Sequence, residues 1–301
     1  MEPQNLESNN IQQDRSENPL GTGTLFIVAT PLGNLEDMTF RAVNTLKQVD
    51  LIAAEDTRHS KKLLSHYGIK TRMISCHEHN EATQTTQLIL QLKNGSSIAL
   101  ISDAGTPCIS DPGYFLVKAA SAQGILVIPI PGCSAAIAGL SVSGLPTDSF
   151  LFLGFLPKKQ QQLNKALEQQ KHQTPTLIIY ESPNRITKLI QTMILVWGNR
   201  NACLAREATK LHEEYIRGPL SLILETLENK DRIKGEIALF VQGCSHDTPP
   251  MTTEMLEIIL MDQLSSTDLS TTALARQIAD QYQISKRIVY EQILNLQKRK
   301  K

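Results

Sequence analysis

The sequence predicts an α/β protein with two consecutive α/β domains and a small helical C-terminal segment. Short apolar runs alternate with segments of helical periodicity from about residue 25 to residue 242, a pattern typical of sheets covered by helices. One turn-rich stretch, GLPTDS (144–149), interrupts this pattern, and another, HDTPPMTT (246–253), follows it. The 301 residues are enough for two domains and a small third.

The first α/β domain is expected over residues 23–146, after a disordered polar leader at 1–22 that lacks the basic and apolar parts of a signal peptide. Alternation of strand and helix favours a mostly parallel sheet. The expected strands are 25–30, 50–55, a short one near 73–74, 97–102 and 125–130. The expected helices are 37–49, 57–67, 81–93, 114–122 and one that begins at 134. The segment ISDPG (109–113) is expected to cap the helix that follows it.

The second α/β domain is expected over residues 147–245, with strands at 150–156, 176–182, 202–206 and 236–242 and helices at 158–171, 184–197 and 219–228. Residues 250–301 are expected to form a helix-turn-helix-like extension with its turn at 283–284 and a basic tail ending in KRKK. The helices are either a helix-turn-helix or a small bundle for packing or dimerisation. The tail is either a solvated charge run or a phosphate-binding segment.

Composition excludes several classes of protein. Thirty Lys and Arg balance thirty Asp and Glu, which excludes a uniformly basic nucleic-acid coat protein. The 41% of hydrophobic residues excludes a disordered chain. Five widely spaced cysteines without a C-x-x-C pair argue against a disulfide scaffold or a thiolate zinc site and favour a reducing, cytoplasmic location. No apolar run reaches the ~18 residues that a membrane span requires.

Three loops of small residues follow strands of the first domain, where doubly wound sheets bind ligands. Pro31, Gly33 and Gly105 shape the backbone for close approach, and the Asp103 carboxylate suits a ribose hydroxyl or an amino-acid ammonium. One such loop is most often an ordinary turn, but three at one edge imply a cofactor site. The loops are TPLGN (30–34), SDAGTP (102–107) and PGCSAA (131–136).

Charged side chains gather in EDTRHSKKLL (55–64). Asp56 is either a helix cap or an acid/base, and Arg58 is either solvated surface or a clamp for phosphate or carboxylate. His77 and His79 lack a matched third ligand, so no metal site is expected.

Two polar segments of the second domain also follow strands, YESPNR (180–185) and AREATKLHEE (205–214). They are either surface loops or the far wall of a cleft that faces the first domain.

Seven motifs occur together: TPLGNLED (30–37), AEDTR (54–58), SDAGTP (102–107), PGCSA (131–135), ESPNR (181–185), REATK (206–210) and KGEI (234–237). In order and spacing they resemble the bacterial 16S ribosomal RNA (cytidine-2′-O)-methyltransferases of the tetrapyrrole-methylase superfamily. The resemblance covers about residues 23–242, and the helical C-terminal segment is consistent with it.

The resemblance implies two α/β domains of tetrapyrrole-methylase type, with S-adenosylmethionine in the cleft between them, a homodimer, and a cytidine in the decoding centre of the small ribosomal subunit as substrate. It carries the family's cofactor contacts to Leu32, Gly33, Thr106, Ile109, Ser134, Ala135, Tyr180, Ala208 and Gly235. Thr106 stands where many relatives have the Asp of a G-D-P motif, and Asp103 is the candidate to take its place.

The implied reaction is attack by a ribose 2′-oxygen on a sulfonium methyl group, for which no metal is needed. Positioning contributes up to ~7–11 kcal/mol and a general base typically ~10²–10⁴-fold. Asp56 or Glu207 is predicted to be the base, and Arg58, Arg185 and Lys210 are predicted to contact RNA.

Other functions remain open. One is a superfamily methyltransferase with a small tetrapyrrole or protein acceptor. A second is a nucleic-acid-binding protein without activity that reads its target through residues 271–297. A nicotinamide-dependent oxidoreductase is disfavoured because the glycine fingerprint is missing.

Overall fold

A computed structural model of the protein describes residues 22–244, 253–266, 270–282 and 285–299. The chain divides into two compact units, Met1–Cys244 and Ser245–Lys301. The predicted leader lies outside the described residues except for Thr22, as do the turn at 283–284 and the end of the basic tail. Within the described residues, no helix combines the length and apolar character that crossing a membrane requires.

The first sheet has five parallel strands in the order β3-β2-β4-β1-β5. The strands are β1 (Thr24–Val28), β2 (Leu51–Ala54), β3 (Met73–Ser75), β4 (Ile98–Ile101) and β5 (Leu126–Ile130). All residues of β2 and β4 are buried. Continuous apolar runs are typical of parallel strands covered on both faces, which is why these strands could be predicted from the sequence.

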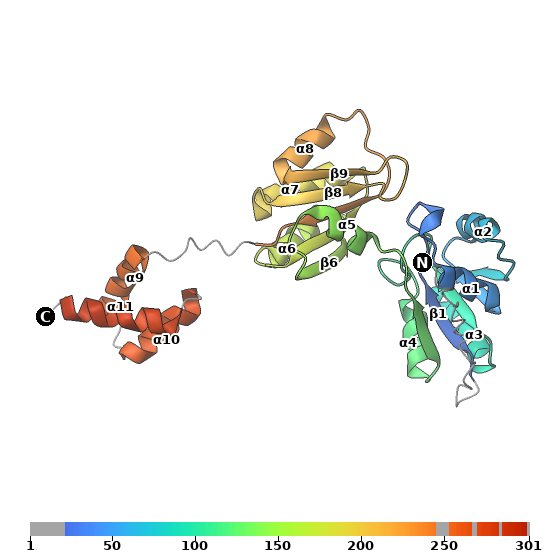
Figure 1. Ribbon diagram of the computed structural model, residues 1–301, viewed down its shortest axis with the longest axis horizontal. Coiled ribbons are helices and arrows are strands. Elements are labelled where there is room, and N and C mark those ends of the chain that lie inside the picture. Colours follow the sequence, from blue (N-terminus) through green and yellow to red (C-terminus); the bar gives the residue numbers. More distant parts are fainter. Residues whose placement is uncertain (1–21, 245–252, 267–269, 283–284, 300–301) are drawn as a thin grey trace, which may run out of the picture. The chain divides into compact units, whose positions relative to one another are not determined.

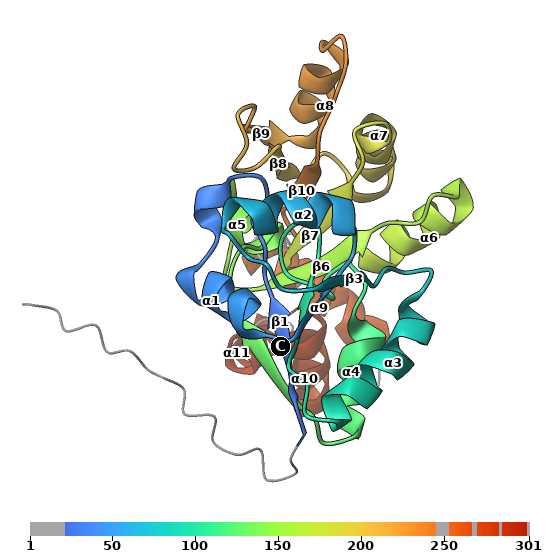
Figure 2. The same ribbon diagram turned by 90° about the vertical axis from the view of Figure 1, so that its right-hand side faces the viewer.

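Helices cover both faces of this sheet (Figure 2). Helices α1 (Phe40–Gln48) and α2 (Thr57–His66) pack on one face, whereas α3 (Glu81–Lys93) and α4 (Tyr114–Ala122) pack on the other. The chain therefore leaves the neighbouring strands β1 and β4 toward opposite faces. Their carboxyl ends form a topological switch point, where open α/β sheets bind ligands.

The bounds of α3 and α4 are those that the sequence predicts, and the N-cap of α4 lies in the predicted capping segment 109–113, but no side chain of that segment caps the helix. Its N-cap, Gly113, offers no side chain. The Glu81 carboxylate accepts instead, at 2.9 Å from the amide nitrogen of Gly113 and 3.0 Å from that of Phe115. A cap supplied by another helix leaves no local signal in the sequence.

The second sheet has the order β6-β7-β10-β8-β9, and only β6 and β7 pair in parallel. The strands are β6 (Phe150–Phe155), β7 (Thr176–Glu181), β8 (Asn201–Arg206), β9 (Glu214–Pro219) and β10 (Ile237–Val241). Because β7 and β8 both run opposite to β10, they end at the edge where β10 begins. Helices α6 (Gln160–Gln170), α7 (Ile186–Trp197) and α8 (Leu220–Glu228) cover one face.

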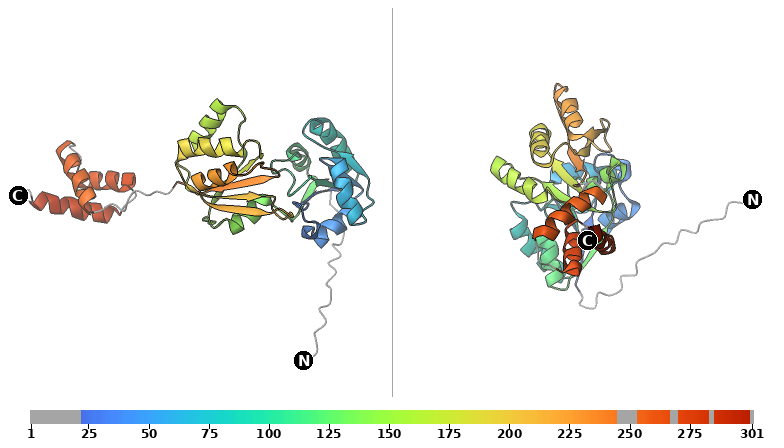
Figure 3. Two further views of the ribbon diagram at one scale, coloured as in Figure 1. Left: turned by 90° about the horizontal axis from the view of Figure 1, so that it is seen from above. Right: turned by 90° about the vertical axis from the view of Figure 1, so that its left-hand side faces the viewer.

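The other face of the second sheet is covered by α5 (Ala135–Ser143). Ala136 and Leu140 of this helix pack with Ile178 and Phe240 of the second sheet. In the chain, however, α5 directly follows β5, which belongs to the first sheet (Figures 1 and 3). The chain thus passes from one sheet to the other in the PGCS turn (131–134). A domain boundary at 146/147 stays a prediction.

The C-terminal unit contains α9 (Thr253–Ser266), α10 (Thr271–Tyr282) and α11 (Lys286–Arg299). Its core is formed by aliphatic side chains of all three helices, among them Leu260, Ile278 and Ile293. The predicted class, two α/β sheet layers and a helical C-terminal segment, is confirmed.

Candidate active site

The three loops that the sequence singles out lie together at the carboxyl edge of the first sheet and are hydrogen-bonded to one another. The amide of Thr30 donates to the Gly105 carbonyl at 2.8 Å, and the Gly105 amide donates back to Thr30 at 3.0 Å. The Thr106 hydroxyl donates to the Cys133 carbonyl at 3.0 Å. The first, second and third loops therefore form one connected wall.

The middle loop has an unusual backbone. Gly105 has a φ of +81°, and the non-glycine residues Cys108 and Ser110 have φ values of 71° and 64°. Left-handed conformations cost a non-glycine residue roughly 1–2 kcal/mol, and such strain clusters at functional sites. Here it brings the Ser110 hydroxyl against the second sheet, where a Cβ atom on Gly154 would lie 3.2 Å from it.

Loops of the second sheet form the opposite wall. The segment after β8 and the segment before β10 are joined, because the Glu207 amide donates to the Glu236 carbonyl and the Glu236 amide donates to the Glu207 carboxylate, both at 3.0 Å. Gly235, with a φ of +93°, allows this turn.

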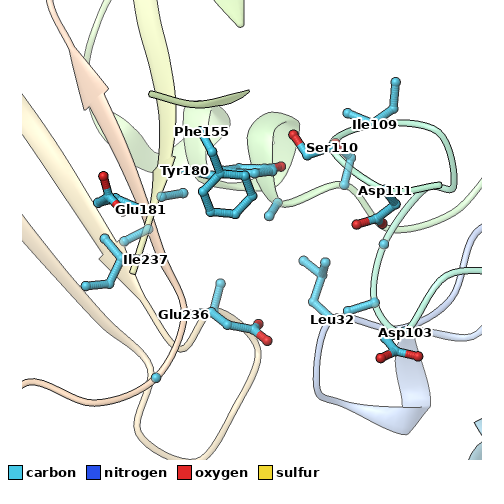
Figure 4. A pocket seen from close by; sticks show the side chains of 18 of the residues that line it. Leu32, Asp103, Ile109, Ser110, Asp111, Phe155, Tyr180, Glu181, Glu236 and Ile237 are labelled. Atoms are coloured by element: carbon cyan, nitrogen blue, oxygen red, sulfur yellow. The ribbon is translucent and has the colours of Figure 1, made fainter. Parts of the chain in front are cut away.

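A cavity of about 420 Å³ lies between the two walls (Figure 4). Its lining comes from both sheets. The lining residues are Leu32, Glu55, Asp103, Ala104, Gly105, Thr106, Ile109, Ser110, Asp111, Ser134, Ala135, Phe155, Tyr180, Glu181, Ser182, Pro183, Ala205, Ala208, Gly235, Glu236, Ile237 and Ala238.

The charge of the lining is of one sign. Five carboxylic acids line the cavity, and no Lys, Arg or His is present among the described residues that do so. Burial, together with the negative charge of Glu55, raises the pKa of Asp111 to about 7. Burial also raises the pKa of Glu55. Such a cavity attracts a cationic ligand and repels phosphate groups.

One side of the cavity is apolar. The rings of Phe155 and Tyr180 meet edge to face, with centroids 5.9 Å apart, and Leu32 and Ile109 also line the cavity. An aromatic and aliphatic lining suits a planar ring. The cavity therefore offers an apolar surface and an acidic surface to one ligand.

Ten of the residues predicted to bind cofactor line this cavity. They are Leu32, Asp103, Gly105, Thr106, Ile109, Ser134, Ala135, Tyr180, Ala208 and Gly235. Pro31 and Gly33 do not line it. Gly33 instead lies against the second sheet's loop, since a Cβ atom there would lie 2.3 Å from Cγ of Lys210. This glycine allows the Lys210 stem to cross close to the first loop.

Asp56 and Arg58 lie beside the cavity rather than in its lining. Their side chains form an exposed ion pair of 2.9 Å, and Asp56 caps α2 through the Arg58 amide. Hydrogen bonds from the Arg58 side chain hold the pKa of Asp56 at about 2. The amide of Asp56 donates to the Asp103 carboxylate at 3.1 Å, which connects this pair to the cavity wall.

Glu207, Lys210 and Arg185 are also outside the lining and are held in ion pairs. The Lys210 ammonium lies 3.0 Å from the Glu207 carboxylate and 3.2 Å from that of Glu236. Burial raises the pKa of Glu207, but the hydrogen bonds from the Glu236 amide and Lys210 outweigh it, so that the pKa is lowered. Arg185 pairs with the buried Glu181 at 3.1 Å and donates to the carbonyls of Leu156 and Pro157.

Sequence reasoning missed several lining residues, above all Glu55, Asp111, Phe155 and Glu236. Each stands beside a strand end or within a motif already singled out. Their position at the carboxyl ends of strands could therefore have identified Glu55 and Phe155 as candidate site residues. For Asp111, the DPG sequence was interpreted as a helix cap, and only the folded loop shows that it lines the cavity. Among the described residues, no group of three or more acids, histidines and cysteines could hold a metal ion.

Comparisons with known proteins agree with this architecture. The family model of the tetrapyrrole (corrin/porphyrin) methylases matches residues 24–223. A protein of Halalkalibacterium halodurans named ribosomal RNA small subunit methyltransferase I is 52% identical over 228 residues, covering 76% of this chain and 78% of its own length. Proteins of the same name from Haemophilus influenzae and Streptococcus pyogenes are 45% and 44% identical, covering 90% and 91% of this chain and 96% of their own length.

Solved structures show the same fold at low sequence identity. Uroporphyrin-III-C-methyltransferase of Thermus thermophilus matches with a TM-score of 0.51 and 18% identity over 73% of this chain and 92% of its own. Cobalt precorrin-4 methyltransferase matches with a TM-score of 0.56 and 14% identity over 75% of this chain and 96% of its own. These comparisons confirm the resemblance carried by the seven motifs. The chain therefore belongs to the tetrapyrrole (corrin/porphyrin) methylase family.

Proposed function

We propose that this protein transfers a methyl group from S-adenosylmethionine to the ribose 2′-oxygen of a cytidine in the 16S RNA of the small ribosomal subunit. One observation carries the proposal, which is identity of 44–52% with proteins named ribosomal RNA small subunit methyltransferase I. The acidic and apolar cavity supports the choice of cofactor. A ribosomal substrate implies a cytoplasmic enzyme.

The residues of the cavity fit S-adenosylmethionine. This molecule carries a sulfonium and an ammonium group against one carboxylate, so that its net charge is positive, and it carries a planar adenine ring. Glu55, Asp103 and Asp111 suit the cationic groups, whereas Glu181 and Glu236 already pair with Arg185 and Lys210. The apolar residues around Phe155 and Tyr180 suit the ring. A nicotinamide dinucleotide would bring phosphates toward these acids, which disfavours that alternative.

When bound, the cofactor supplies the methyl group and a good leaving group. The protein has to hold the acceptor oxygen in line and exclude water. In this proposal, Asp103 holds the ribose or the ammonium of the cofactor, and the strained loop that carries Ser110 fixes one wall against the second sheet. Arg58, with 90% of its side chain exposed, is available to contact RNA phosphate. Lys210 and Arg185 would have to exchange their present ion pairs to do so.

Asp56 and Glu207 remain the candidate bases. Because both carboxyls have a lowered pKa, they are weak bases at neutral pH, and the expected effect lies at the low end of the range for general bases. Glu207→Gln and Asp56→Asn are each tested for methyl transfer in single turnover. If one of them is the base, its amide variant should lose ~10²-fold in rate with little change in cofactor affinity. If both variants keep wild-type rates, neither is the base.

The substrate is tested with radiolabelled S-adenosylmethionine and small ribosomal subunits from a strain that lacks this gene. Label is expected in a dinucleotide that resists alkali, because a 2′-O-methyl group blocks the hydroxyl that cleaves RNA. Naked 16S RNA serves as the comparison, and subunits are expected to be the better substrate because the chain has balanced charge and few aromatic residues for base stacking. Label in mononucleotides would place the methyl group on a base and contradict the proposal.

The same assay separates the alternative functions. Methyl transfer to tetrapyrroles or proteins, without label in RNA, would favour the small-molecule or protein acceptor. RNA binding that depends wholly on residues 250–301, without transfer, would favour the binding protein. The cavity favours the enzyme, because all the described residues that line it come from the α/β unit and none from the C-terminal helices.

We also propose a homodimer. Large apolar side chains are exposed on α4, β5, α5 and β6, and β5 and β6 are each the edge strand of a sheet. The exposed residues are Tyr114, Phe115, Leu126, Ile137, Val142 and Phe150. Exposed apolar surface beside open edges is typical of surfaces that associate, and a second copy of this chain is the partner that the family resemblance implies.

A further inference from the structure

We propose that the Asp111 carboxyl is protonated in the empty cavity and releases its proton when a sulfonium cation enters, so that the cavity distinguishes the methyl donor from its neutral demethylated product. This inference rests on the proposed function, because it takes S-adenosylmethionine as the ligand. It assigns a role to an acid that the motif comparison did not single out.

The position of Asp111 supports this assignment. Its side chain points into the cavity from the strained loop between β4 and α4, on the same wall as Asp103 (Figure 4). A hydrogen bond with Ser102 favours its ionised form. Asp111 therefore faces any ligand that the cavity holds.

The charged groups that act on Asp111 come from its own loop and from two other segments, and all are acids. Glu55 follows β2, Asp103 follows β4 and Glu236 precedes β10. Tyr180 and Cys108 also interact with it electrostatically, and for both groups burial raises the pKa. In the absence of a cation, burial and these carboxylates hold the pKa of Asp111 near neutrality, at about 7.

The sign of the effect follows from the charge of the ligand. A cation in the cavity stabilises the Asp111 carboxylate, and its proton passes to the solvent. The demethylated product, S-adenosylhomocysteine, has the same ammonium and carboxylate but no sulfonium, so its net charge is zero. Its binding gives the carboxylate much less stabilisation. After methyl transfer the Asp111 carboxylate therefore takes up a proton again. The cavity then loses the charge interaction that stabilised the bound methyl donor.

Calorimetric titration of the full chain tests the proposal. Between about pH 5.5 and pH 7, the affinity for S-adenosylmethionine should rise by roughly tenfold, because only the ionised fraction of Asp111 binds the cation well. The affinity for S-adenosylhomocysteine should change by less than about twofold. This range lies below the usual pKa of an α-amino group, so the ligand's ammonium contributes little.

Two variants serve as comparisons. Asp111→Asn keeps the shape of the side chain, and its affinity for S-adenosylmethionine should not change between about pH 5.5 and pH 7. Asp148→Asn removes an exposed acid of the segment between α5 and β6 and should keep the wild-type rise. Titration of the wild-type chain in two buffers with different ionisation heats adds a measurement that needs no variant. It should show release of about half a proton or more per cation bound near pH 6.5 and almost none for the product.

The outcomes separate this inference from the proposed function. If S-adenosylmethionine binds but its affinity and its proton release match those of S-adenosylhomocysteine, the role of Asp111 is wrong and the cofactor assignment stands. If Asp111→Asn keeps the full rise, another group carries the proton. If S-adenosylmethionine binds at no pH, the proposed function itself fails.

Discussion

Replacing Asp103 by asparagine is expected to weaken the binding of S-adenosylmethionine by ~30-fold or more, which corresponds to about 2 kcal/mol. Asp103 lines the cavity, and its carboxylate accepts the amide of Asp56 at 3.1 Å. Asparagine keeps this acceptor, so the loop should stay in place while the charge that pairs with the ligand is lost. Titration calorimetry at neutral pH measures the effect.

The product provides the control for this first variant. S-adenosylhomocysteine carries the same ribose and ammonium, so it should lose affinity for Asp103→Asn to a similar degree, in contrast to the behaviour expected for Asp111. An affinity for both ligands within about twofold of the wild type would contradict a cofactor contact at Asp103.

Phe240→Ala is expected to lower the free energy of unfolding by about 3–5 kcal/mol. Phe240 is fully buried in β10 beneath α5, and a Cβ atom on Gly139 would lie 2.3 Å from its ring. Helix and ring are in such close contact that the loss of the ring leaves a cavity that α5 cannot fill without moving.

Urea unfolding, followed through the fluorescence of Trp197, measures this loss. Trp197 is the only tryptophan of the chain and packs in the core on the opposite face of the same sheet. The matched control is Phe40→Ala, because Phe40 is 91% exposed and the loss of its ring should change the free energy of unfolding by no more than about 0.5 kcal/mol. Equal losses for the two variants would contradict the packing role of Phe240.

The sequence predicted the first sheet more completely than the second. Buried parallel strands such as Leu51–Ala54 and Ile98–Ile101 are continuous apolar runs, and the helices between them have clear periodicity. Strand β9 was missed because EYIRGP is a partly exposed edge strand with two charged residues. Among the described strands it pairs with β8 alone, and such a strand depends on its neighbour rather than on its own pattern. The antiparallel order of the second sheet was not predicted for the same reason.

The sequence predicted those residues of the site that belong to local motifs. Loops at strand ends identified Leu32, Asp103 and Thr106, because their position at the sheet edge follows from the alternation of strands and helices. The acidic character of the cavity did not follow from any one motif. It arises where Glu55, Asp111 and Glu236 meet from distant segments, and pairing between positions so far apart in the chain cannot be deduced from one sequence. The ion pair between Lys210 and Glu236 is hidden for the same reason.

The packing of α5 also has a consequence for synthesis of the chain. This helix leaves the ribosome long before β10, since Gly139 precedes Phe240 by roughly a hundred residues, and domains generally fold as units during translation. The first sheet can therefore fold before the second sheet, against which α5 packs, has been synthesised. The apolar face of α5 remains uncovered until the last strand of the second sheet emerges. A nascent chain arrested after α5 and before β10 would expose the apolar face of α5. At this stage of synthesis the protein would depend most on chaperones.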